Sequence, residues 1–173
     1  MVKTSKADRI YAGIGSRETP PEILDLMERI AMFLARRGVV LRSGGARGAD
    51  SAFERGCKRA NGRREIFLGE LSPEQRVKIH TSSAYKVLLA VNPYLPHITR
   101  SQQVLIERDV LQILGADLAT PVQRVVCWTP NGVAEGGTRY ALAVAYDNDI
   151  QVDNLALPRV QQKWEQHLME HAA

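Results

Sequence analysis

Short apolar segments that end in glycine alternate with longer segments of helical periodicity along most of the chain. Residues 9–15 show the pattern, because an apolar run closes on Gly13-Ile14-Gly15 and a helical segment follows. Strands that each lead through a short turn into a helix are typical of a mainly parallel sheet with helices on both faces. We therefore expect an α/β three-layer sandwich around a five-stranded, mainly parallel sheet.

The expected helices follow the spacing of their apolar residues. The strands are placed at residues 9–15, 39–41, 65–68, 125–128 and 150–152. The helices are placed at residues 20–37, 49–59, 73–91, 100–114, 138–146 and 158–171. Thr19 is expected to cap the first helix, because Pro20 suits the first helical position and Glu22 can complete a capping box. No linker or repeat interrupts the pattern, so one domain is expected over residues 1–173.

The composition is that of an ordinary globular protein. Hydrophobic residues make up 45% and charged residues 24% of the 173 residues, which suffices for one full-sized core. No apolar run approaches the roughly 18 residues that a membrane span needs. The opening residues lack the apolar stretch of a secretory signal. We therefore expect a cytoplasmic protein without a membrane partner.

Neither the cysteines nor the histidines are spaced like a set of metal ligands. Cys57 and Cys127 lie far apart and have no CxxC partner, so reduced thiols are expected rather than a disulfide or a zinc site. No HExxH sequence is present, and His167 and His171 are expected on the surface near the end of the last helix. We therefore expect no metal site and no bound cofactor.

Three glycine-rich turns lie where expected strands end and helices begin, at Gly13–Arg17, Ser43–Gly48 and Gly136–Thr138. Glycine lets a backbone approach a phosphate closely, and the helix that follows offers free N–H groups and a positive dipole end. The alternative is that each glycine only permits a tight turn. No turn has the GxxxxGK[ST] sequence or a complete dinucleotide fingerprint. The candidate ligand-binding residues are Gly15, Ser16, Arg17, Ser43, Gly44, Gly45, Arg47, Gly136, Gly137 and Thr138.

The overall charge suits a ligand that carries phosphate. The formal net charge is +4 and the isoelectric point is about 9.3, although the basic residues are dispersed among acidic ones. Arg100, Arg108 and Arg124 are candidates for a basic rim. Trp128 and Tyr140 flank the third turn, where they either stack on a base or pack in the core.

Asp50 and Glu135 are the candidate acid–base groups. Asp50 stands in the first turn of an expected helix, where it either complements the helix dipole or orients a ribose or an attacking water. Glu135 and Asp153 are expected near the same edge of the sheet. Two carboxylates at that edge are suited to cleavage of a glycosidic bond, and simple solvation on the surface is the alternative for each.

These motifs resemble those of the superfamily that joins the DNA-processing protein DprA, also called Smf, to the Lonely Guy phosphoribohydrolases. Its GSR turn and its SGGA-G-D turn, about 26 residues later, read here Gly15-Ser16-Arg17 and Ser43-Gly44-Gly45-Ala46-Arg47-Gly48-Ala49-Asp50. Gly136-Gly137-Thr138 matches a third element, and the resemblance covers most of residues 9–156. It implies a Rossmann-like fold with the strand order 3-2-1-4-5, in which the first and third turns face one another.

The resemblance implies phosphate-directed binding of single-stranded DNA or of a nucleotide, as in the DprA core. Lonely Guy enzymes carry a PGGxGTxxE sequence whose glutamate helps to remove a base from a nucleoside monophosphate. The matching stretch here, residues 131–141, lacks the leading PGG and has no glutamate after Thr138. A hydrolase of the nucleotide N-glycosidic bond and a sensor domain for a signalling nucleotide are the alternatives, so enzymatic activity is left open.

The resemblance also implies a homodimer, because small members of this superfamily are commonly dimers. The expected helices at residues 73–91 and 100–114 exceed what a minimal strand–helix–strand core needs. Their apolar residues either cover the sheet or meet a second subunit. These residues are Val77, Tyr85, Leu88, Leu89, Val104, Leu105, Leu111 and Leu114.

Overall fold

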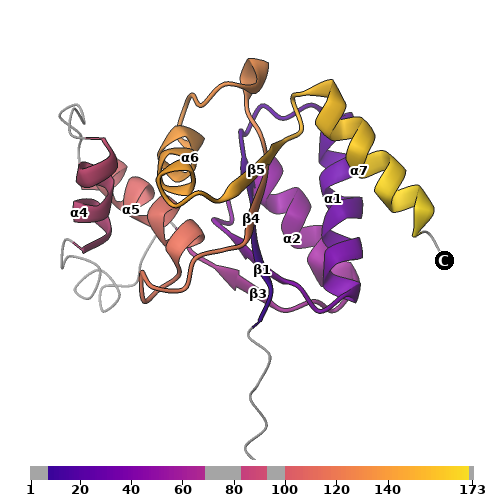
Figure 1. Ribbon diagram of the computed structural model, residues 1–173, viewed down its shortest axis with the longest axis horizontal. Helices are drawn as coiled ribbons and strands as arrows, with labels where there is room; N and C mark the ends of the chain where they lie inside the picture. Colours follow the sequence, from indigo (N-terminus) through magenta and orange to yellow (C-terminus); the bar gives the residue numbers. More distant parts are fainter. Residues whose placement is uncertain (1–7, 69–82, 93–99, 172–173) are drawn as a thin grey trace, which may run out of the picture.

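A five-stranded parallel sheet with the order β3-β2-β1-β4-β5 forms the centre of the molecule (Figure 1). It is seen in a computed structural model that describes residues 8–68, 83–92 and 100–171. The strands are β1 (Ile10–Gly15), β2 (Val40–Ser43), β3 (Arg64–Ile66), β4 (Arg124–Trp128) and β5 (Gln151–Asn154). The expected fold class and strand order are confirmed.

The helices form one layer on each face of the sheet (Figure 1). One layer holds α1 (Pro21–Arg36), α2 (Ala49–Arg59) and α7 (Pro158–Glu170). The other holds α4 (Ser83–Val91), α5 (Arg100–Leu114) and α6 (Thr138–Asp147). A short 3-10 helix, η1 (Pro130–Gly132), follows β4. Among these helices, none is long and apolar enough to cross a membrane.

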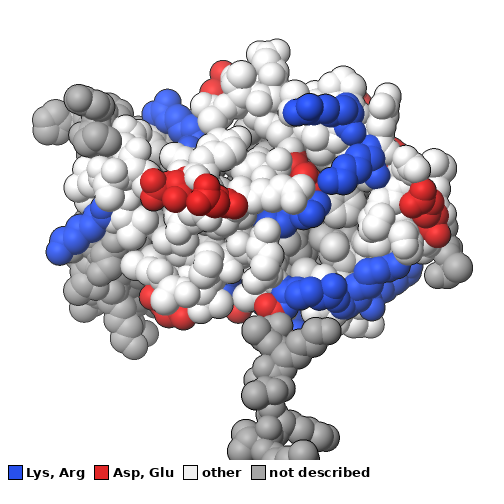
Figure 2. Space-filling view, in the orientation of Figure 1, with Lys and Arg blue, Asp and Glu red and all other residues white. Residues whose placement is uncertain are grey.

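The alternation of side chains along the strands divides the apolar core in two. Ile10, Ala12 and Ile14 of β1 pack beneath α4, α5 and α6, whereas Tyr11 packs beneath α1, α2 and α7. The sheet is therefore buried on both faces, as parallel sheets are. On the face of the molecule in Figure 2, basic and acidic side chains are interspersed, with Lys and Arg more frequent over the side where α7 lies.

The apolar residues of α4 and α5 were expected either to cover the sheet or to meet a second subunit, and some of them cover the sheet. Leu88 and Leu114 are buried in the core. Leu89 and Leu105 remain exposed, with 36% and 37% of their surface accessible. Residues 69–82, which hold the expected start of the first of these helices, lie outside the described residues.

The start of α1 differs from the expected cap. Pro20 precedes the helix, Pro21 is its first residue, and no side chain caps it. Thr19 is buried, and its hydroxyl donates instead to the carbonyl of Ser16 (2.7 Å). Ser16 Oγ in turn accepts from the N–H of Glu18 (3.0 Å). Because proline presets the helical backbone angle and has no N–H to satisfy, the helix starts without a cap and Thr19 closes the preceding turn.

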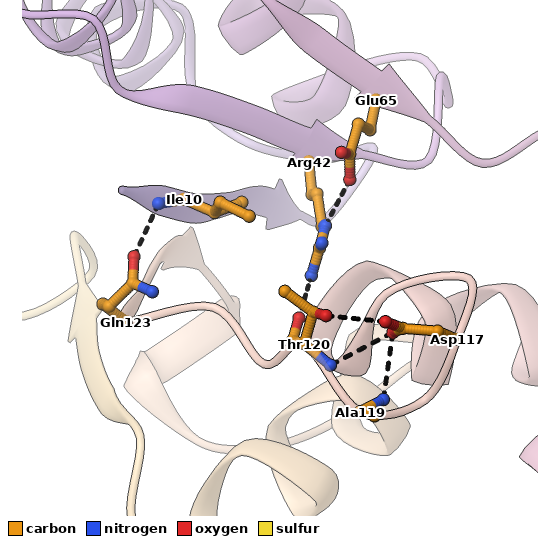
Figure 3. Close-up of polar contacts among 7 residues, drawn as sticks. All are labelled: Ile10, Arg42, Glu65, Asp117, Ala119, Thr120 and Gln123. Atoms are coloured by element: carbon orange, nitrogen blue, oxygen red, sulfur yellow. Dashed lines mark hydrogen bonds and ion pairs between the residues drawn. The ribbon is translucent and has the colours of Figure 1, made fainter. Parts of the chain in front are cut away.

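A buried arginine ties the loop between α5 and β4 to the edge of the sheet (Figure 3). Arg42 is 3% exposed and donates to Glu65 (2.5 Å) and to the carbonyl of Thr120 (2.5 Å). The loop is closed on itself by Asp117, which accepts from the N–H groups of Ala119 and Thr120 and from the Thr120 hydroxyl. A buried charge that is paired in this way fixes the position of the loop beneath β2.

Candidate functional site

A cavity of about 660 Å³ opens at the carboxyl edge of the sheet. It forms where the chain leaves β1 for α1 on one face and leaves β4 for α6 on the other, although β1 and β4 are neighbours. Open parallel sheets bind ligands at such a point, because the two connections separate and leave a crevice. We call it the carboxyl-edge cavity.

The first and third glycine turns meet in this cavity, together with both candidate acid–base groups. The sequence-predicted residues that line it are Gly15, Ser16, Arg17, Asp50, Glu135, Gly136, Gly137 and Thr138. Arg17 and Glu135 are exposed at its mouth. The two turns therefore face one another, as the resemblance implied.

Most of the second glycine turn lies behind the lining, and Ala46 is the one residue of this turn that lines the cavity. Ser43 is buried, and its hydroxyl donates to the carbonyl of Gly13 (2.7 Å). A side chain at Gly44 would collide with Gln112 and would come within 2.8 Å of the Asp50 carboxylate. Gly45 and Arg47 are exposed outside the lining. The turn thus supports the bottom of the cavity, and Gly44 is needed because other side chains approach its backbone.

Asp50 lies at the bottom of the cavity and is 3% exposed. Its carboxylate accepts a hydrogen bond from the N–H of Ala46 (3.2 Å). Backbone hydrogen bonds from Gly44 and Gly15 also reach it, so it joins the first turn to the second. Burial raises the pKa of the Asp50 carboxyl to about 6, while the positive charge of Arg108 acts in the opposite direction. Asp50 is therefore more than a partner of the helix dipole.

A second buried carboxyl, Asp109 of α5, lies near Asp50 and is 5% exposed. Arg108 donates to it (3.1 Å), and the Gln112 amide lies 3.5 Å from the same oxygen. Burial raises the pKa of Asp109 to about 7; Arg108 lowers it, and the Asp50 charge raises it. We call Asp50, Arg108, Asp109 and Gln112 the cavity floor.

The charge of the cavity depends on these two carboxyl groups. The charged residues in its lining are Arg17, Arg108, Arg139, Glu18, Asp50, Asp109 and Glu135. Counted over the described residues of the lining, the charge is −1 with every group ionised and +1 with Asp50 and Asp109 protonated. Since the pKa values are about 6 and about 7, the sign changes near neutral pH.

The third turn leads directly into α6 and leaves its start open. Gly136 adopts a left-handed backbone (φ +62°), and no atom of the described residues lies within 4 Å of a side chain placed at Gly136 or Gly137. Within the described part of the chain, no side chain caps α6, which begins at Thr138. The first N–H groups of this helix and the Thr138 hydroxyl therefore remain available to an anion in the cavity.

The contribution of α5 was missed, although Arg108 was considered as part of a basic rim. Arg108 also donates to the carbonyl of Gly44 (3.4 Å), so it links α5 to the second turn. A signal was present in the sequence: Asp109 and Gln112 are polar residues three positions apart at buried positions of the helix. Buried polar groups of this kind need partners, and these two mark the side of α5 that lines the cavity.

Two expectations are corrected by the structure: Arg124 does not belong to a basic rim of the cavity, and Asp153 does not lie beside Glu135. Arg124 and Asp153 pair with each other (2.6 Å) and do not line the cavity. Asp153 also accepts from the Trp164 indole (3.1 Å), so the pair joins β4, β5 and α7. Trp128 packs against the core under α1 and α2, while Tyr140 lines the cavity. The side chain of Arg100 lies outside the described part of the chain.

A family model described as DNA recombination-mediator protein A matches residues 2–120. The fold is similar to the X-ray structure of DNA processing protein A (DprA) from Streptococcus pneumoniae, with a TM-score of 0.55 and 14% identity. That match covers 96% of this chain and 57% of the other, so this chain spans little more than half of that protein. No curated protein matches.

Proposed function

Because the chain belongs to the DNA recombination-mediator protein A family, we propose that its carboxyl-edge cavity binds the phosphate of single-stranded DNA. The observation that carries this proposal is the convergence of the first and third glycine turns and the open start of α6 on one cavity. Each of these features offers donors to an anion, and together they surround one position.

The phosphate is assigned to the wall that the two turns form. The N–H groups at the start of α6 supply fixed donors, and the Ser16 and Thr138 hydroxyls add two more. Arg17 supplies an exposed positive charge at the mouth. Because Gly136 and Gly137 leave open space, a phosphate oxygen can approach the backbone there without meeting a side chain.

The floor is assigned to the rest of the nucleotide. Asp50 and Asp109 accept hydrogen bonds when ionised and can donate one each when protonated. The N–H groups of a base match an ionised carboxylate and its carbonyl oxygens match a protonated carboxyl, whereas a phosphate would be repelled by an ionised floor. We therefore expect phosphate affinity to increase as the pH falls through about 7 and about 6, where Asp109 and Asp50 become protonated.

A hydrolase of the nucleotide N-glycosidic bond is the second candidate, and the buried floor favours it. A carboxyl with a pKa of about 6 or about 7 can donate a proton to a departing base near neutral pH. Water then adds to the sugar carbon, and its proton returns to the neighbouring carboxylate. In this version the pair is Asp50 and Asp109, since Glu135 is exposed at the mouth.

Two matched arginine variants test the binding proposal. Arg17 and Arg47 are both exposed in glycine turns, but Arg17 lines the cavity and Arg47 does not. Arg17→Ala should weaken binding of a short fluorescent oligothymidylate by about 1–3 kcal/mol, the range for a charge-assisted contact. Arg47→Ala should leave it nearly unchanged. Equal affinities for the two variants, measured by anisotropy, would remove the cavity from the proposal.

Competition and product analysis separate the alternatives. If a mononucleotide competes as well as the oligonucleotide, the cavity is a small-ligand pocket rather than a contact for a polymer. Release of free base from nucleoside monophosphates, lost in Asp50→Asn, supports the hydrolase. No release with any of the common monophosphates, from protein that binds them, would exclude it.

A further inference from the structure

The last turn of α7 gathers three groups that commonly ligate metals. His167, Glu170 and His171 are exposed, and one ligand atom of each lies within 4.8 Å of the other two. Glu170 and His171 follow His167 by three and four residues, which places each of them beside His167 on the surface of the helix. The expectation that no metal site exists considered the histidines as a pair and left out the carboxylate that completes the set.

A hydrogen bond prepares His171 for coordination. Its Nδ1 lies 2.8 Å from the carbonyl oxygen of His167. Because a carbonyl only accepts, Nδ1 carries the proton, and in the neutral ring Nε2 keeps a free lone pair. Metal-binding histidines commonly use their second nitrogen in this way, since the bond fixes both the tautomer and the ring orientation.

The other two groups are held by neighbours as well. Phe33 of α1 contacts both imidazole rings, with centroid distances of 5.0 Å to His167 and 5.8 Å to His171. The Gln166 amide donates to Glu170 (2.7 Å), which orients the carboxylate and leaves its second oxygen for another partner. Side chains that are already held lose little freedom when they bind an ion.

We propose that His167, Glu170 and His171 bind one divalent transition-metal ion such as Zn²⁺. Two imidazole nitrogens and one carboxylate oxygen suit zinc, copper and nickel better than magnesium or calcium. Ligand atoms bound to one tetrahedral zinc lie about 3.3 Å apart, so modest side-chain rotations close the present spacing. The negative end of the α7 dipole also favours a cation there.

The site is separate from the carboxyl-edge cavity. The end of α7 lies on the opposite side of the molecule from α4 and α5 (Figure 1).

His167 and Glu170 also line a second cavity, of about 560 Å³, beside the amino ends of β1 and β4. Three protein ligands leave at least one position of a four-coordinate ion for water or another ligand. A bound ion would also stabilise the folded state, because the cluster depends on an intact helix end packed on Phe33.

The test is zinc titration of the untagged full chain by calorimetry, together with its melting temperature. We expect one equivalent of Zn²⁺ to bind and the melting temperature to rise. His167→Phe keeps a ring against Phe33 but removes the nitrogen, and His171→Ala removes the oriented ligand. Each should weaken zinc binding by about tenfold or more, as should Glu170→Gln.

The matched control replaces the other two histidines of the sequence, His80 and His97, with alanine, and it should bind zinc like the parent. The absorption of the Co²⁺ form gives a second readout, because nitrogen and oxygen ligands give no thiolate charge-transfer band. The proposal is overturned if no Zn²⁺ binds, if affinity survives in both His167→Phe and His171→Ala, or if the Co²⁺ spectrum shows ligation by thiolate.

Discussion

Replacing Asp109 with asparagine removes a carboxyl group that is 5% exposed and whose pKa is raised to about 7 by burial. The ordinary pKa of aspartate is 3.8, so the folded state holds the proton over a pH range in which the unfolded chain has released it. The contribution of Asp109 to the free energy of unfolding is therefore fully present below about pH 4, decreases as the pH rises, and is lost above about pH 7.

The size of the effect follows from the size of the shift. A shift of about three pKa units corresponds to about 4 kcal/mol of stability lost at high pH. Asparagine recovers only part of this free energy, because burying its polar amide has a cost of its own. The carbonyl oxygen of the new amide would still accept from Arg108. We therefore expect Asp109→Asn to raise the free energy of unfolding by about 2 kcal/mol at pH 8 and to change it little, or lower it, at pH 5.

Urea unfolding at several pH values between about 5 and about 8 measures the difference. Asp117→Asn is the control, because hydrogen bonds from Thr120 and Ala119 lower the pKa of this exposed carboxyl. Its contribution is lost only as the pH falls below the ordinary range, so the effect of Asp117→Asn should stay constant between pH 5 and 8. If Asp109→Asn destabilises the protein equally at both ends of that range, Asp109 is ionised throughout and the floor does not change its charge near neutral pH.

Three further results are expected. Gly44→Ala should lower stability by more than about 1 kcal/mol, because its side chain would meet Gln112 and Asp50, whereas Gly137→Ala, which has open space, should melt like the parent. Arg42→Ala should cost about 2–4 kcal/mol in urea unfolding, since it strips the buried contacts to Glu65 and Thr120, and a loss below about 0.5 kcal/mol would contradict that role. Light scattering across a dilution series should show the mass of a homodimer, which the exposed Leu89 is available to support; a monomer mass at every concentration, with and without oligonucleotide, would refute it.

The sheet was predictable because its signals are local. Glycine ends β1 at Gly15, and the apolar runs of β1, β2 and β4 are too short for helices and buried on both faces. The strand order came from the resemblance of the turn motifs rather than from periodicity. The cap of α1 was mispredicted because Thr19 had two possible partners, and the carbonyl of Ser16 is the one it uses.

The cavity was predictable only in part, because its floor depends on contacts across the fold. The first and third turns follow adjacent strands, so their meeting is a consequence of strand order. The pairing of Arg108 and Asp109 beside Asp50 depends on how α5 lies over the sheet, which no local pattern specifies. The place of Arg124, in contrast, could have been predicted from the sequence. It stands at the start of β4, which puts it at the amino edge of the sheet, away from the cavity.

The most direct test of the proposed phosphate site is the ¹⁵N–¹H spectrum of the protein during titration with thymidine monophosphate and a short oligothymidylate. Binding in the carboxyl-edge cavity should shift the backbone amides of Ser16, Thr138 and Arg139 first. The N–H groups of Thr138 and Arg139 lie at the proposed phosphate position, and the Ser16 amide, which donates to the carbonyl of Trp128 (3.1 Å), would report on the Ser16 hydroxyl beside it. Amides of α7 should remain unchanged at the same ligand concentrations. Saturable shifts that are confined to other surfaces, with these three amides unmoved, would contradict the assignment of the cavity as the nucleotide site.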